Sequence, residues 1–140
     1  MFGFLRRRTR EPIVFPDSGA AFRYACENLD NALLLEAVVP ALVEERGRVG
    51  AEGERYFSIR LANRSGGRVI DACTLKEATD APAVGDLVGF KVVRVEPELP
   101  EPFDLLGFIA YRLATVYVPG KGWPVERNYV PDNIKPMLRL

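Results

Sequence analysis

The sequence predicts an α+β domain in which one N-terminal helix packs on a mainly antiparallel sheet of about five or six strands. Three observations predict this fold. One early segment repeats apolar residues at helical spacing, several later segments alternate apolar and polar residues, and short Gly- or Pro-bearing turns join them. The same pattern fits a sheet curled into a small barrel or half-barrel, and the sequence leaves that alternative open.

The helix is predicted over about residues 18–29. Asp17 or Ser18 is placed to cap its first turn, because short polar side chains accept hydrogen bonds from the free N–H groups there. A short strand over residues 13–15 is expected to precede it. The apolar face of the helix is Ala21, Phe22, Ala25, Cys26 and Leu29.

Residues 33–43 form an apolar stretch interrupted by Glu36. As a strand, this stretch places Pro40 at a sheet edge or bulge, because proline cannot donate to a ladder. A helix over residues 33–39 is the alternative. If the segment is a strand, one of its faces carries Leu35, Ala37, Val39, Ala41 and Val43.

The clearest local pattern is a β-hairpin in the middle of the chain. Residues 55–62 alternate apolar and polar side chains, residues 63–67 have turn composition, and residues 68–74 form the returning strand. This pattern needs no distant contact to be recognised.

Three more strands are predicted after the hairpin: one ending near residue 95, one over 105–118 and one over 124–130. The acidic, Pro-rich segment 96–104 separates the first two. We expect it to be extended and solvated, without ladder hydrogen bonds.

Charge divides the chain into a basic tail and an acidic body. The 140 residues hold 19 basic and 19 acidic side chains, and four of the basic ones are arginines within residues 1–10. The rest therefore carries 15 minus 19, or −4. We expect residues 1–11 to be a flexible basic tail and residues 12–140 to be a single globular domain.

Residue usage disfavours most catalytic and metal chemistry. Histidine is absent, and Cys26 and Cys73 have no spacing typical of zinc or redox sites. We therefore predict no catalytic residue, no metal site and no cofactor. An enzyme that uses carboxylates without histidine is the least favoured function, with Asp71 as its candidate acid. Sparse cysteine and the lack of a membrane-spanning apolar run predict a cytoplasmic protein.

Residues 85–88, Gly-Asp-Leu-Val, resemble the strand-opening turn of S1-type and other OB-like small barrels that bind RNA. The resemblance implies a face that stacks bases and holds phosphates, and the acidic body disfavours nucleic acid as a partner. The residues of the face implied by the barrel resemblance are Tyr56, Arg60, Phe90, Lys91 and Arg94.

The whole chain also resembles short bacterial proteins of unassigned function, and that resemblance assigns no activity to it.

Aromatic side chains in the last predicted hairpin provide the leading functional candidate. Tyr117, Trp123 and Tyr129 lie close together in the sequence, and such residues either anchor interfaces or cap a small core. We predict a non-enzymatic binding or assembly module that contacts a protein partner or a second copy, as in a homodimer. The tail, with Phe2 and Phe4 before its arginines, offers at most a weak contact with anionic lipid.

Overall fold

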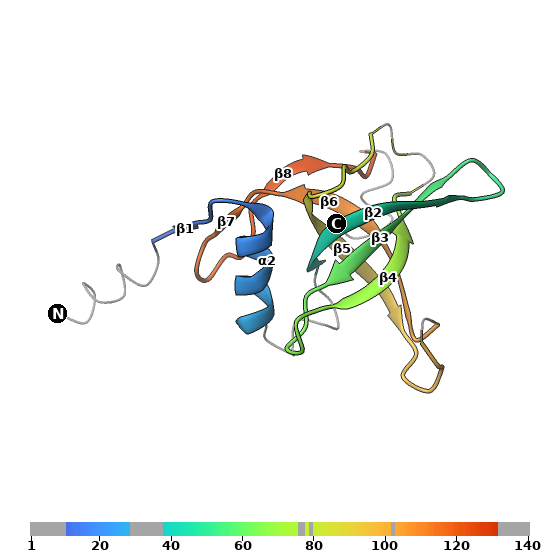
Figure 1. Ribbon diagram of the computed structural model, residues 1–140, viewed down its shortest axis with the longest axis horizontal. Coiled ribbons are helices and arrows are strands. Elements are labelled where there is room, and N and C mark those ends of the chain that lie inside the picture. The colour runs from blue at the N-terminus through green and yellow to red at the C-terminus, as the bar shows by residue number, and fades with distance from the viewer. Residues whose placement is uncertain (1–10, 29–37, 76–77, 79, 102, 132–140) are drawn as a thin grey trace.

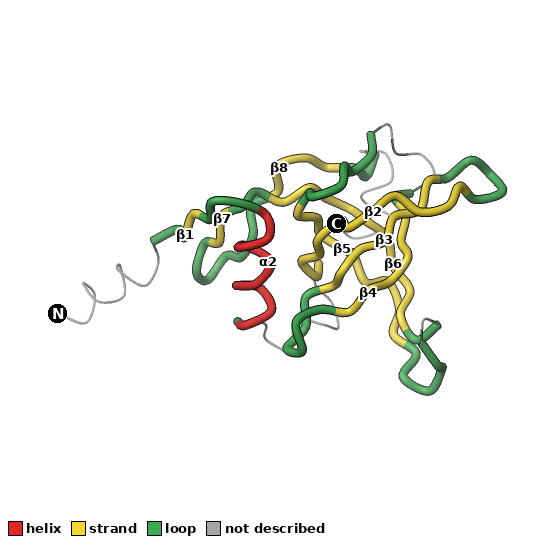
Figure 2. Tube along the Cα trace, viewed as in Figure 1, coloured by secondary structure: helices red, strands yellow, loops and turns green. Residues whose placement is uncertain are grey.

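The structure is a computed structural model that describes residues 11–28, 38–75, 78, 80–101 and 103–131. It contains one helix and two antiparallel sheets (Figures 1 and 2). The elements are β1 (Ile13–Val14), α2 (Ser18–Glu27), β2 (Val38–Val49), β3 (Arg55–Leu61), β4 (Arg68–Cys73), β5 (Leu87–Val95), β6 (Leu105–Leu113), β7 (Val116–Tyr117) and β8 (Val125–Asn128).

The main sheet has six strands in the order β4-β3-β2-β5-β6-β8, and β1 pairs with β7 in a second, two-stranded sheet. This confirms the predicted α+β fold with one helix on a mainly antiparallel sheet. The main sheet is strongly curved, because β4 and β6 contact each other although three strands separate them in the ladder. Within the described residues no strand pairing closes β4 onto β6, so the sheet stays open.

The helix α2 begins and buries its face as its sequence predicts. The Asp17 carboxylate accepts a hydrogen bond of 2.8 Å from the Ala20 N–H, which confirms Asp17 as the cap. Four of the predicted apolar residues are buried, and Leu29 lies outside the described residues. These four side chains, which join the helix to the sheet, are Ala21, Phe22, Ala25 and Cys26.

The core lies on the face of the sheet that α2 covers. Successive side chains of a strand point to opposite faces. Ile109 on β6 therefore belongs to the main core, and its neighbour Phe108 belongs to a small second cluster with Ala110 and Val130. The other large, fully buried side chains of the main core are Val43, Phe57, Ile59, Leu87, Val88 and Phe90.

Pro40 occupies neither a sheet edge nor a bulge, contrary to the prediction, because β2 lies between β3 and β5 and the ladder is regular where Pro40 pairs with Gly89. Its carbonyl accepts a hydrogen bond of 2.8 Å from the Ala62 N–H, immediately after β3 ends at Leu61. Pro40 has no backbone N–H to donate, but it faces β3 just beyond the last residue of that strand. The ladder between β2 and β3 therefore needs no donor at this position. The buried positions Val39 and Val43 confirm the predicted strand face over the described part of this segment.

The strand predicted over residues 105–118 is divided in two. β6 ends at Leu113, and the next residues bond to other partners: the Ala114 N–H donates to the Pro124 carbonyl and the Thr115 carbonyl accepts from the Phe15 N–H, both at 2.9 Å. The chain thus leaves the main sheet at this point and enters the small sheet with β1. Because these partners are distant in sequence, the local pattern could not reveal the break.

Candidate functional site

Two of the three predicted C-terminal aromatic residues belong to an intramolecular cluster. Tyr117 and Trp123 pack together at 5.3 Å between ring centroids. Trp123 also stacks on Phe15 at 5.8 Å, and Tyr117 contacts Tyr24 of α2 at 5.3 Å. All four rings are half-buried, and they hold β1 and α2 against the β7 turn. This aromatic cluster, defined as Phe15, Tyr24, Tyr117 and Trp123, is therefore engaged within the molecule.

Tyr129 lies in the core, which is the second of the two alternatives that the sequence leaves open for the C-terminal aromatic residues. It is 3% exposed and belongs to the main core. Its N–H donates to the Ala110 carbonyl at 2.9 Å, while the Asn128 side chain accepts from the Val130 N–H and bends the chain at the end of β8. Burial is the main cause that raises the pKa of the Tyr129 phenol to about 12.

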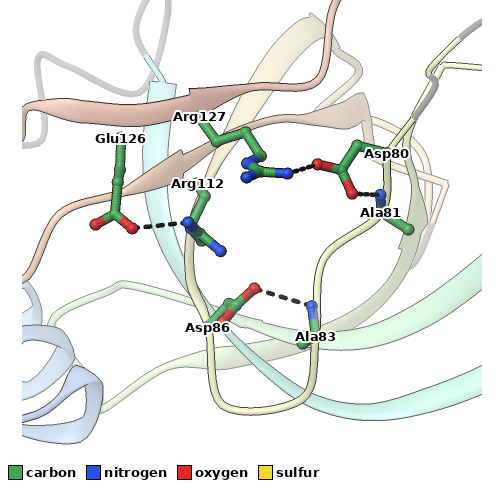
Figure 3. A network of polar contacts seen from close by, with 7 residues as sticks. All are labelled: Asp80, Ala81, Ala83, Asp86, Arg112, Glu126 and Arg127. Carbon is green, nitrogen blue, oxygen red and sulfur yellow. Dashed lines mark hydrogen bonds and ion pairs between the residues drawn. The ribbon is translucent and has the colours of Figure 1, made fainter.

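A network of charged side chains holds the loop before β5 against β6 and β8 (Figure 3). Asp80 pairs with Arg127, and Arg112 pairs with Glu126 at 2.8 Å. The Asp86 carboxylate accepts from the Ala83 N–H at 2.9 Å and thereby closes the turn. The hydrogen bond from Arg127 lowers the pKa of Asp80. The two ion pairs balance four of the five charges, and the fifth, Asp86, is held by a backbone N–H. The Nε of Arg112 is buried and has no hydrogen-bond partner within the described residues. The contacts of Asp80 and Asp86 fix the loop.

The five residues of the implied nucleic-acid face do not share one face. Phe90 is 1% exposed and lies in the main core, so it cannot stack a base. Lys91 is the next residue on β5 and points to the opposite face, where it lies across from Phe108 of β6. On β3, two strands away, the Tyr56 ring lies 3.9 Å below the guanidinium of Arg48.

The two arginines of that predicted face are paired with acidic side chains. Arg60 contacts Glu44 at 3.1 Å, and Arg94 pairs with Glu96 at the end of β5. Their charges are therefore partly compensated by neighbours on the same surface. This arrangement weakens the attraction for phosphate that the predicted face requires.

The largest concentration of exposed apolar side chains lies at the end of the β5–β6 hairpin, which projects from the sheet (Figure 1). Ten large apolar side chains are exposed in the described part of the chain, and five of them fall within residues 93–106. Phe103 is 70% exposed and Leu106 is 58% exposed. We call these five residues the hairpin end: Val93, Val95, Leu99, Phe103 and Leu106.

The ladder places these side chains on both faces of the hairpin. Leu105 packs on the main core, so Leu106 points to the other face, whereas Val95 pairs with Leu105 and lies on the same side as Leu105. An irregularity between Val92 and Arg94 shifts the register, and Val93 lies in this bulge without a partner in the ladder. The bulge is the kind of device that turns a side chain outward at the end of a hairpin.

The loop of the hairpin is folded, contrary to the predicted extended segment. The Glu96 N–H donates to the Asp104 carbonyl at 2.7 Å and closes the loop. Two turns lie inside it, because the Leu99 N–H donates to the Glu96 carbonyl at 3.0 Å and the Phe103 N–H donates to the Pro100 carbonyl at 2.8 Å. These backbone bonds give Leu99 and Phe103 defined positions.

Acidic residues surround the apolar side chains of the hairpin end. Residues 93–106 contain four carboxylates and one arginine, which gives a net charge of 1 minus 4, or −3. Arg68 of β4 forms two hydrogen bonds with Asp104, and these bonds lower the pKa of that carboxyl. Glu101 also lies 3.8 Å from Arg68, and Glu96 pairs with Arg94, so three of the four carboxylates have an arginine partner. With Arg68 included, the net charge is 2 minus 4, or −2. The exposed apolar side chains are therefore flanked by charged groups with a small acidic excess, which we call the acidic rim.

Other features offer less to a ligand. A cleft of about 160 Å³ between α2 and the β3–β4 turn is smaller than typical ligand sites. Asp71 is exposed on β4 opposite Ser58, which removes the buried environment that a catalytic acid would use. Burial raises the pKa of both thiols, Cys26 and Cys73, so they are weak nucleophiles. Within the described residues no group of side chains is arranged to bind a metal ion.

Sequence reasoning missed the hairpin end because prolines and carboxylates make segment 96–104 look solvated. A signal was present, since Leu99 and Phe103 are large apolar residues in a polar loop.

None of the described helices has the length and apolar character needed to cross a membrane. In comparisons with known proteins, no family model, curated protein or solved structure matches the chain.

Proposed function

We propose that this chain is a non-enzymatic binding module whose hairpin end contacts a protein with an apolar centre and a basic rim. The observation that carries the proposal is the grouping of half of the exposed large apolar side chains on one projecting hairpin. Apolar groups gathered in this way are typical of interaction surfaces, whereas scattered ones need no explanation.

The charge of the hairpin end supports a basic protein partner. Residues 93–106 together with Arg68 carry a net charge of 2 minus 4, or −2, which favours lysine and arginine side chains over phosphate backbones. Its apolar centre and charged rim also follow the usual organisation of protein interfaces.

The rigidity of the hairpin supports the same function. Its closing hydrogen bonds and the Arg68–Asp104 ion pair order the surface before a partner arrives. Less conformational entropy is then lost on binding. Leu99 and Phe103 can therefore act as anchors although they belong to a loop.

Single-stranded nucleic-acid binding is a second candidate, favoured by the order of the strands. Strands β2 to β6, counted one to five along the chain, lie in the order three-two-one-four-five. In OB barrels the same strands lie next to one another. These barrels bind ligands on strands two and three and through the loops after strands one and four. The loop after the fourth strand is here residues 96–104, so the hairpin end occupies a position used for ligands. Its acidic rim ranks a protein ligand above a nucleic acid.

Selection from a library of random peptides displayed on phage tests the leading proposal. We expect the full-length protein to enrich peptides with aromatic or aliphatic centres flanked by arginine or lysine. The double variant Phe103→Ser/Leu106→Ser should lose these peptides, because it removes the two apolar anchors and leaves the ladder intact. Val84→Ser is the matched control, since Val84 is 55% exposed outside the hairpin.

Two results would contradict the proposal. The first is a selection that enriches no common sequence, and the second is enrichment that the hairpin variant leaves unchanged. A mixed oligonucleotide at low salt, followed by fluorescence anisotropy, tests the second candidate. Binding that Arg60→Ala weakens would support a nucleic-acid ligand.

A further inference from the structure

We infer that the hairpin end binds the N-terminal segment, residues 1–10, of a second copy of this chain, so that copies associate head to tail. The inference rests on the proposed function and specifies its partner. It draws on the composition of that segment, on the hairpin end and on the positions of both in the molecule.

The two segments are complementary in chemistry. Residues 1–10 contain four large apolar side chains including Met1, four arginines and no carboxylate. The hairpin end has five apolar side chains, and residues 93–106 together with Arg68 carry a net charge of −2. The apolar residues Phe2, Phe4 and Leu5 would contact the apolar centre, and the arginines that follow would reach the rim carboxylates, for which guanidinium groups are well suited.

The fold separates the first described residues from the hairpin end. The described chain begins at residue 11, just before β1, and β1 and the β5–β6 hairpin lie on opposite sides of the molecule with α2 and the sheet between them (Figure 1). A contact between copies avoids wrapping the segment around its own domain.

Such a contact is heterologous, because one copy contributes its N-terminal segment and the other its hairpin. Heterologous contacts leave a free segment and a free hairpin at the two ends of each dimer. Further copies can therefore add, and the products are chains or rings rather than closed dimers. This property distinguishes the inference from a symmetric homodimer.

Sedimentation velocity of the full chain and two variants tests the inference. The tail variant Phe2→Ser/Phe4→Ser/Leu5→Ser keeps the arginines and an intact hairpin. The hairpin variant Phe103→Ser/Leu106→Ser keeps an intact segment 1–10. We expect the unmodified chain to associate with increasing concentration, and each variant alone to associate at least about tenfold more weakly.

The decisive sample is a mixture of the two variants. The hairpin variant still donates its N-terminal segment and the tail variant still accepts it, so the mixture should form a one-to-one dimer that grows no further. A control mixture of the tail variant with Val84→Ser should also form heterologous contacts, because Val84 lies outside the hairpin end. Higher salt should weaken every complex, since opposite charges meet at the rim.

Three outcomes would overturn the inference. They are a monomeric unmodified chain at all concentrations, association that the tail variant leaves unchanged, and a mixture of variants that remains monomeric. If the hairpin still selects basic apolar peptides from the library, the proposed function stands and only its partner is wrong. If the unmodified chain instead sediments with phosphatidylserine vesicles and the tail variant does not, without self-association, the segment binds lipid and the inference fails.

Discussion

Arg68 and Asp104 form a bidentate ion pair that joins β4 to the start of β6 across the curved sheet. The two guanidinium nitrogens lie 3.0 and 2.6 Å from the two carboxylate oxygens. Both side chains are mostly buried from solvent, with 23% and 22% exposure. The pair therefore fixes the base of the projecting hairpin to a strand that is not its ladder neighbour.

Replacing Arg68 with methionine should lower stability in a pH-dependent way. The hydrogen bonds from Arg68 lower the pKa of Asp104 in the folded protein. The ionised pair therefore stabilises the fold above the usual carboxyl pKa, and this contribution is lost as the pH falls through the lowered value. Arg68→Met should reduce the urea midpoint at pH 7, and its difference from the unmodified chain should shrink as the pH falls below the usual carboxyl pKa and through the lowered pKa of Asp104.

Arg46→Met is the control for that measurement, because Arg46 is an exposed arginine on β2. It should leave the urea midpoint close to that of the unmodified protein. An Arg68→Met variant as stable as Arg46→Met at pH 7 would show that the ion pair contributes nothing to the fold.

Gly107→Ala should destabilise the protein because β6 approaches β5 closely at this position. A Cβ atom on Gly107 would lie 2.6 Å from the Phe90 ring and in contact with the Lys91 carbonyl oxygen. We expect a loss of about 1–3 kcal/mol in the free energy of unfolding. Gly19→Ala is the control, since its Cβ would meet only ordinary contacts in α2 and alanine favours helices. Equal stabilities of the two variants would contradict the packing described here.

Tyr129 should make the protein sensitive to alkali. Its pKa is raised to about 12 by burial, whereas the unfolded chain ionises at the ordinary value near 10. The unfolded state therefore loses the proton first, so stability is complete below about pH 10 and falls between pH 10 and 12. Absorbance titration at alkaline pH should show one tyrosine that ionises late, and Tyr129→Phe should remove that phase. Ionisation of all tyrosines together in the native protein would contradict the burial.

Trp123→Ala should destabilise the fold rather than change its association. The indole packs on Phe15 and Tyr117 of its own chain, so its loss opens a cavity between β1 and β7. We expect a cost of about 2 kcal/mol for this half-buried ring, and a smaller one for Trp123→Phe. Thermal unfolding measures both. Loss of self-association with unchanged stability would instead restore the aromatic cluster as an interface.

The sequence predicted elements whose patterns are local. The hairpin of β3 and β4 alternates strictly, and Phe57 and Ile59 are buried as the alternation requires. The helix α2 and its Asp17 cap were likewise readable from spacing and residue type. These features depend on neighbours within a few residues, so a single sequence is sufficient for them.

Features that depend on distant partners could not be predicted. The sequence leaves open whether Tyr129 anchors an interface or caps the core, and the bend after β8 decides this by turning the side chain into the core. Leu105 and Leu106 are identical residue types in sequence, yet the register with β5 buries one more than the other. The hairpin end follows from that register and from the bulge at Val93, so it became visible only in three dimensions.

Binding at the hairpin end is measured most directly by titrating ¹⁵N-labelled full-length protein with a peptide enriched in the phage selection. We expect the perturbed backbone amide signals to cluster in residues 93–106, with the non-hairpin residue Val84 unaffected. The Phe103→Ser/Leu106→Ser variant should show no such perturbation. Perturbations centred on Phe15 and Trp123, or on Tyr56 and Arg60, with the hairpin unchanged, would contradict binding at the hairpin end.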